Sequence, residues 1–211
     1  MNPEATRSFL SRPPARRAFV DAVIFALLAA VVSVAAWRSE PVEDLLIGNP
    51  QKIFQDGEWY RVVTSLFLHA DLHHLLANMF FLIPFGGLLT NYYGRWVFPV
   101  MGVVLGIFGQ LLSLKTYPLE MNLMGASGLL YVLFGLWLAF YYRAESHLPR
   151  ATRWLRTLGF GLVMFIPSQV EQTVSYRTHF IGLALGLAAG VVYGFLKRRD
   201  FERRNEPYLI P

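Results

Sequence analysis

The chain has 211 residues, of which 55% are hydrophobic, 15% aromatic and only 16% charged, and it carries a net charge of +5. Soluble domains typically contain about 25% charged residues, so the composition argues against an ordinary soluble enzyme and excludes a disordered chain, which needs low hydrophobicity and high charge. The sequence has no cysteine, which excludes a disulfide framework, a thiol nucleophile and a zinc site built on thiolates.

Long apolar runs separated by charged connections dominate the sequence. A helix needs about 20 mostly apolar residues to cross the hydrocarbon core of a bilayer. Five runs meet this length: residues 18–37, 72–94, 96–114, 121–142 and 178–196. A sixth run, residues 157–170, is shorter and suits a buried or interfacial helix as well as a short span; together with Leu155 and its flanks we interpret it as a span. The sequence therefore predicts an all-α membrane protein, a bundle of six transmembrane helices.

The basic residues predict the orientation of these helices. With six alternating spans, 14 of the 19 Lys and Arg residues fall on one side of the membrane; the other five are Arg38, Lys52, Arg61, Lys115 and Arg177. Basic residues concentrate on the cytoplasmic side, so residues 1–17 and 197–211 are predicted to be cytoplasmic segments around a membrane domain of residues 18–196. The expected setting is a multi-pass protein of a bacterial inner (plasma) membrane, with the lipid bilayer and not nucleic acid as the partner of the positive charge.

The basic start and the first apolar run also resemble a signal peptide. The apolar core of a signal peptide usually has about 7–15 residues, whereas this run has about 20 and five further membrane segments follow it. We therefore interpret it as the first helix. The arginine-rich start, residues 1–17, also resembles a mitochondrial presequence, a less favoured alternative because Glu4 interrupts a short leader.

Polar residues inside apolar runs are costly in a bilayer and usually face a cavity or a functional site. The first such group is Gly125-Ala126-Ser127-Gly128, at the start of the fourth predicted helix. There a serine lies beside unpaired N–H groups and the positive end of the helix dipole. The alternative is that the small residues only pack helices together.

The second group is His179 followed by Gly182, Gly186, Gly190 and Gly194. Glycines four residues apart form one stripe along a helix, and such a stripe lets a neighbouring backbone come close. His179 lies on nearly the same face as Gly182. The alternative is a histidine that merely caps its helix at the membrane interface.

The third group contains His69, His73, His74 and Asn78. His74 and Asn78 are four residues apart and share a helix face, and both can donate hydrogen bonds to a developing negative charge. Polar contact between helices is the alternative. His69 and His73 are also four apart, but no H-E-x-x-H pattern is present, so a metal site is not expected.

Together the three groups supply the residue types that acyl transfer requires. A serine nucleophile needs a base to take its proton, and the tetrahedral oxyanion needs preorganised donors. With no carboxylate placed to orient the histidine, the predicted machinery is a Ser127–His179 dyad. Tyr131, one turn after Ser127, can orient the imidazole by stacking.

The order of these motifs from about Trp59 to Gly190 resembles the rhomboid family of intramembrane serine proteases, which implies a six-helix rhomboid-like bundle. The resemblance implies that Ser127 is the nucleophile and that His179 is the general base, then the acid toward the leaving amine. It implies an oxyanion hole formed by His74, Asn78 and the Ser127 N–H. The implied substrates are transmembrane proteins cut in or near their membrane segments, and no cofactor is implied.

The resemblance also implies supporting roles. Tyr131 would stack on His179. Gly128 and Gly182 would let the fourth and sixth helices meet. Gly125 lies in the same motif as the serine, two residues before it. His69 resembles a position that organises water and the loop near the site. The short fifth run, with Pro167, is expected to form a gate that admits substrate laterally.

The sequence departs from the family pattern at two places. Thr90 replaces an acidic residue common in relatives, and the pair Arg177-Thr178 replaces small residues before the histidine. Two other functions are weighed against the protease. A rhomboid-like pseudoprotease would bind membrane proteins without cutting them, but such relatives commonly lose Ser or His. A small transporter would need charges at the membrane midplane and internal symmetry.

Overall fold

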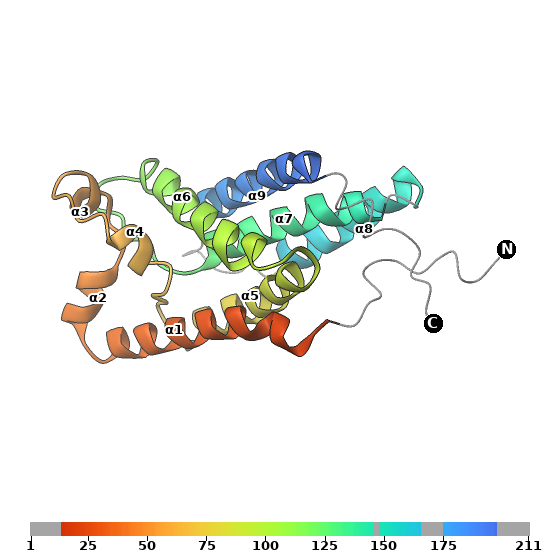
Figure 1. Ribbon diagram of the computed structural model, residues 1–211. Helices are drawn as coiled ribbons and strands as arrows, with labels where there is room; N and C mark the ends of the chain where they lie inside the picture. Colours follow the sequence, from red (N-terminus) through yellow and green to blue (C-terminus); the bar gives the residue numbers. More distant parts are fainter. Residues whose placement is uncertain (1–13, 146–147, 166–174, 198–211) are drawn as a thin grey trace.

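The computed structural model describes residues 14–145, 148–165 and 175–197. Within these ranges the regular structure is helical, apart from one antiparallel bridge between Gly48 and Leu123. The long helices lie side by side as a bundle, and three short helices gather at one end of it (Figure 1).

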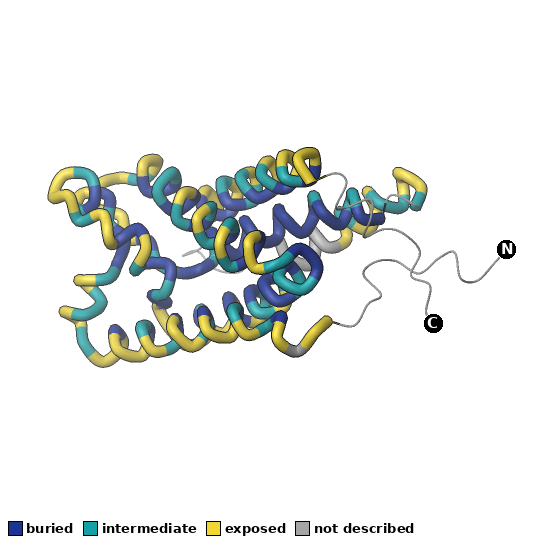
Figure 2. The backbone as a smooth tube through the Cα atoms, viewed as in Figure 1, coloured by how far each residue is buried: buried dark blue, intermediate teal, exposed yellow. Residues whose placement is uncertain are grey.

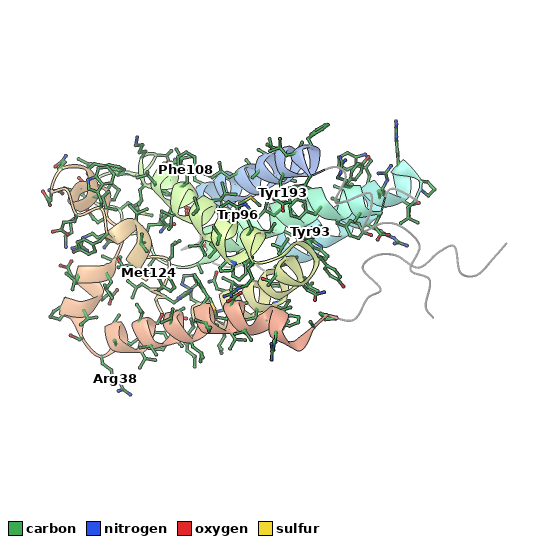
Figure 3. All side chains as sticks on the ribbon, viewed as in Figure 1. Arg38, Tyr93, Trp96, Phe108, Met124 and Tyr193 are labelled. Atoms are coloured by element: carbon green, nitrogen blue, oxygen red, sulfur yellow. The ribbon has the colours of Figure 1, made fainter. Side chains whose placement is uncertain are left out.

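Four helices of the described chain are long and apolar enough to cross a membrane, by length and composition. They are η3 with α1 (Arg16–Phe19, Val20–Trp37), α5 (Leu72–Tyr93), η4 with α6 (Trp96–Met101, Gly102–Leu114) and α9 (Tyr176–Leu196). They confirm the predicted runs 18–37, 72–94, 96–114 and 178–196. Large apolar side chains such as Trp96 and Phe108 project from the outside of the bundle (Figure 3). Such a surface suits lipid, not water.

Helix α7 (Ser127–Ala144) occupies the centre of the bundle, and every residue from Gly128 to Leu138 is buried (Figure 2). A helix that is hydrophobic all round is a buried helix. The predicted run began at residue 121, but the helix begins at Ser127. Leu123 exchanges backbone hydrogen bonds with Gly48, and Gly125 adopts a positive φ of 109°, so the segment before Ser127 is a connecting loop.

Helix α8 (Arg150–Phe165) starts earlier than the predicted run 157–170, and its first two turns carry Arg150, Arg153 and Arg156. Arg153 donates a hydrogen bond to the Tyr142 carbonyl at the end of α7, and its guanidinium lies over the Tyr142 ring. The described arrangement is consistent with six helices. Pro167 and the rest of the predicted gate lie outside the described residues.

The connection between α1 and α5 folds into the short helices α2 (Glu40–Leu46), α3 (Pro50–Phe54) and α4 (Arg61–Thr64). Arg61, only 3% exposed, anchors them. Its guanidinium donates to the Ile47 carbonyl at 3.1 Å and to the Asp44 carbonyl, and it pairs with Glu58. One arginine therefore joins the end of α2 to the start of α4.

The opposite end of the bundle has its own polar links. Arg95 forms two hydrogen bonds with Asp21 of α1, at 2.7 and 2.5 Å. Thr90, which stands where relatives often carry an acidic residue, donates its hydroxyl to the Phe98 carbonyl at 2.9 Å. Its polar group is therefore satisfied within the turn that joins α5 to η4.

Helices α7 and α9 are in direct backbone contact. A Cβ atom added to Gly186 would lie 2.2 Å from the Val132 carbonyl oxygen, and one added to Gly135 would lie 2.6 Å from the Leu183 oxygen. No side chain fits between the two backbones at these positions. Close approach of this kind gains van der Waals contact where lipid gives no hydrophobic drive for helix association.

We expect Gly186→Ala to destabilise the bundle, because the added methyl group meets a backbone oxygen that cannot rotate away. Overpacking costs about 1–3 kcal/mol, which should lower the melting temperature in detergent by several degrees. Gly159→Ala is the matched control, since nothing lies within 4 Å of a Cβ at that position of α8. Equal melting temperatures for the two variants would contradict the tight contact.

Candidate active site

Ser127 is the first residue of α7 and follows a tightly held loop. The Gly125 N–H donates to the Ser65 carbonyl at 2.9 Å, and the Ala126 N–H donates to Nε2 of His69 at 3.3 Å. The positive φ of Gly125 is a conformation that L-residues rarely adopt. A Cβ there would also lie 2.8 Å from the His74 ring, so only glycine fits.

His69 is fully buried and holds this loop through Nε2, while its Nδ1 faces groups outside the loop. Because Nε2 accepts from Ala126, the proton belongs on Nδ1, which lies 3.3 Å from both the Phe67 carbonyl and the Ser33 hydroxyl. Trp37 Nε1 donates to the His69 carbonyl at 2.7 Å. Burial lowers the pKa of His69 to about 4, so the ring stays neutral near pH 7, as its acceptor role requires.

His179 lies in the first turn of α9, is 6% exposed and stacks on Tyr131. The ring centroids are 4.2 Å apart and the ring planes differ by 17°. Tyr131 is one turn after Ser127 and so on the same face of α7. Among the described residues, Nδ1 of His179 has no hydrogen-bond partner. Ring stacking on Tyr131 therefore contacts one face of this imidazole, and no carboxylate of the described residues bonds its Nδ1.

Two small-residue contacts bring the helix starts of α7 and α9 together. A Cβ on Gly182 would lie 2.4 Å from the Gly128 carbonyl oxygen, and a Cβ on Gly128 would lie 2.7 Å from Cγ2 of Thr178. Gly128 follows Ser127 directly, and Thr178 precedes His179. The serine and the histidine thus belong to adjoining turns of two touching helices.

His74 approaches the same loop from α5. Its backbone N–H donates to the Asp71 side chain at 2.7 Å, which caps the helix. Its ring lies edge-on to His69, with centroids 5.0 Å apart, and beside Gly125. The imidazole of His74 therefore borders the loop that leads into Ser127.

Asn78 lies one turn further along α5 and is 5% exposed. Its Nδ2 donates to the His74 carbonyl at 2.9 Å. An amide group carries two N–H donors, so this bond leaves donor capacity in the amide. The contact joins the Asn78 amide to the backbone of His74, and the predicted pairing of the two side chains as oxyanion donors stays a prediction.

Two buried polar residues near this loop escaped the sequence analysis. Gln110 of α6 donates to the Ser65 hydroxyl at 3.1 Å, and a Cβ on Gly128 would lie 3.8 Å from its Oε1. Ser33 of α1 holds His69. The sequence signal that could have identified both residues is a single polar residue within an otherwise apolar run. The same signal identified Ser127.

Metal binding finds no support among the residues that the structure describes. No three or more His, Asp or Glu side chains of these ranges gather closely enough to hold an ion. The polar groups of the candidate site are a hydroxyl, imidazoles and an amide.

Comparisons with known proteins identify the family. The family model for the rhomboid domain matches residues 56–196. The YdcA protein of Bacillus subtilis, provisionally named a rhomboid protease, is 30% identical over 174 residues, which cover 82% of this chain and 81% of that protein.

Two longer relatives agree. The rhomboid protease GluP of Bacillus subtilis is 28% identical over 157 residues, 72% of this chain and 29% of that protein. RHOMBOID-like protein 5 of Arabidopsis thaliana is 28% identical over 162 residues, 76% of this chain and 52% of that protein. With its apolar helices and a family match over more than half of its length, the chain is an integral membrane protein that belongs to the rhomboid family.

Proposed function

We propose that this protein is an intramembrane serine endopeptidase that uses Ser127 and His179 to hydrolyse peptide bonds in or near transmembrane segments of membrane proteins. The observation that carries the proposal is the near-parallel stacking of His179 on Tyr131, one turn from Ser127. A buried imidazole held by a ring on the serine helix is suited to take a proton from that serine.

In the proposed reaction, His179 accepts the proton of the Ser127 hydroxyl as the oxygen attacks the substrate carbonyl carbon. The protonated imidazole then gives this proton to the leaving amine, and the peptide C–N bond breaks. Water, deprotonated by His179, next attacks the acyl-enzyme ester and releases the second product. Tyr131 keeps the ring in place through both steps.

The proposed oxyanion hole lies where α7 begins. The N–H of Ser127 belongs to the first turn of the helix, where N–H groups lack intrahelical acceptors and the dipole favours negative charge. The His74 ring, beside Gly125, and the Asn78 amide would supply side-chain donors. Donors held in place before the reaction stabilise an oxyanion without reorganisation.

The proposed orientation places both termini in the cytoplasm of a bacterium whose inner membrane holds the protein. Helix α1 begins and α9 ends at one end of the bundle, opposite α2 to α4 (Figure 1). Three basic residues lie at helix termini on this same side of the bundle: Arg95, Arg143 and Arg150. Ser127 and His179, each in the first turn of its helix, would then open toward the exterior.

We expect Ser127→Ala and His179→Ala each to lower kcat for a purified transmembrane substrate in liposomes by at least about a thousandfold, because each removes one half of the dyad. A fluorophosphonate probe should label the wild type and not Ser127→Ala. Ser113→Ala is the matched control, since the hydroxyl of this buried serine of α6 donates to the Gly109 carbonyl within its own helix.

Folded Ser127→Ala protein that cuts at the wild-type rate would overturn the proposal. Wild-type protein that binds the substrate but does not cut it, and does not react with the probe, would indicate the pseudoprotease instead.

We expect His74→Ala and Asn78→Ala to lower kcat by about a hundredfold with little change in KM, because an oxyanion donor acts mainly in the transition state. His73→Ala, which changes the exposed neighbouring histidine, serves as the control. An unchanged kcat in both variants, measured in the same cleavage assay, would remove these side chains from the proposed oxyanion hole.

A further inference from the structure

We infer that the hydroxyl groups of Tyr117, Ser175 and Thr178 form a clamp that positions His179. The Tyr117 hydroxyl is hydrogen-bonded to Ser175 Oγ, and Ser175 Oγ is hydrogen-bonded to Thr178 Oγ1. The Thr178 backbone N–H also donates to Ser175 Oγ, at 3.3 Å. The catalytic consequence of this clamp rests on the proposed function.

Three hydrogen bonds converge on Ser175 Oγ, and this oxygen can satisfy all of them at once. A serine hydroxyl has one proton and two acceptor positions. Ser175 Oγ accepts from the Thr178 N–H, accepts from one of the two neighbouring hydroxyls and donates its own proton to the other. Loss of the Tyr117 or Thr178 hydroxyl therefore breaks a continuous chain.

The clamp joins the two segments that lead to Ser127 and to His179. Tyr117 lies near the start of the loop 115–126, which runs from the end of α6 to Ser127. Ser175 immediately precedes α9, and its carbonyl accepts the backbone N–H of His179 at 3.2 Å. The chain of hydroxyls thus includes Ser175, whose carbonyl is hydrogen-bonded to the His179 N–H, and it ends at Thr178, the residue before His179.

Arg177 adds a second link on the outer side. Its guanidinium donates to the Thr116 carbonyl at 2.7 Å and lies 5.3 Å from the centre of the Tyr117 ring. Arg177 and Thr178 are the pair that replaces the small residues expected before the histidine. Thr178 belongs to the clamp, and Arg177 adds a separate contact between α9 and the same loop.

A simple helix cap would not need these contacts. Ser175 caps α9 by accepting the Thr178 N–H, and a cap of this kind is complete within its own helix. The bond to Tyr117 crosses 58 residues of sequence. It fixes α9 to another part of the bundle, which capping does not require.

The clamp restricts the rotation of α9 about its axis close to His179, whose ring this rotation would move. The Gly128–Gly182 contact fixes α9 three residues after His179, and Ser175 fixes it four residues before. Side chains lie about 5–6 Å from a helix axis, so a rotation of about 10° moves the imidazole by about 1 Å. A displacement of about 1 Å can cost about a hundredfold in rate.

The first test compares isosteric variants. We expect Tyr117→Phe and Thr178→Val each to lower kcat about tenfold, with KM and melting temperature near those of the wild type. The double variant should lose no more than either single one, because both break the same chain. Thr178→Ser, which keeps the hydroxyl, should keep most of kcat. Tyr60→Phe changes an exposed tyrosine whose hydroxyl bonds Glu58, and it should match the wild type.

The second test needs no activity. Proton NMR of histidine-labelled protein in detergent should show an upfield His179 ring signal, caused by the Tyr131 ring and identified by its loss in His179→Asn. Tyr117→Phe should move this signal toward the unstacked position, and Tyr60→Phe should not.

An unchanged His179 signal in Tyr117→Phe, or an unchanged kcat in active protein, would overturn the inference. Cleavage retained by Ser127→Ala would instead overturn the proposed function, and the NMR signal would still decide whether the clamp holds the ring.

Discussion

Direct backbone contact between α7 and α9 sets the geometry on which the candidate site depends. A Cβ on Gly182 or Gly186 would overlap a carbonyl oxygen of α7, so the two helices have one separation and little freedom to slide. In a bilayer, packing contacts such as these replace the hydrophobic drive that holds soluble helices together. Because α7 is buried on every side, its position is fixed in turn by α5 and α6, and the turns that carry Ser127 and His179 stay in register.

Polar contacts add to the positioning of α7 and α9 that the glycine contacts provide. They concentrate at the end of the bundle where these two helices start. The loop before Ser127 is held by the Ser65 carbonyl and by His69, whose own ring is held by Ser33. On the α9 side, Ser175 holds the helix start. A buried network whose members are satisfied is rigid, whereas an unsatisfied one is costly in a low dielectric. Hydrogen bonds therefore hold the starts of both helices in place, an arrangement that suits the proposed oxyanion hole.

The fold was predictable where the sequence signal is local, and the site only in part. Apolar runs predict four long helices with bounds close to those observed, because lipid demands length and apolarity. The start of α7 was predicted six residues early, since Leu123 pairs with Gly48 across 75 residues of sequence. Helical spacing relates Ser127 to Tyr131 within one helix but does not place Ser33 against His69 or Tyr117 against Ser175. Contacts between helices depend on how the helices pack in three dimensions. The spacing of residues along one sequence does not reveal this packing.

The most direct test of the account is a crystal structure of the protein after reaction with a fluorophosphonate. The account predicts a bond from phosphorus to Ser127 Oγ, the His179 imidazole beside that oxygen and stacked on Tyr131, and a phosphoryl oxygen within hydrogen-bond distance of the Ser127 N–H and the His74 or Asn78 side chain. An adduct on a different residue, or a His179 ring too far from Ser127 Oγ to share a proton, would contradict it.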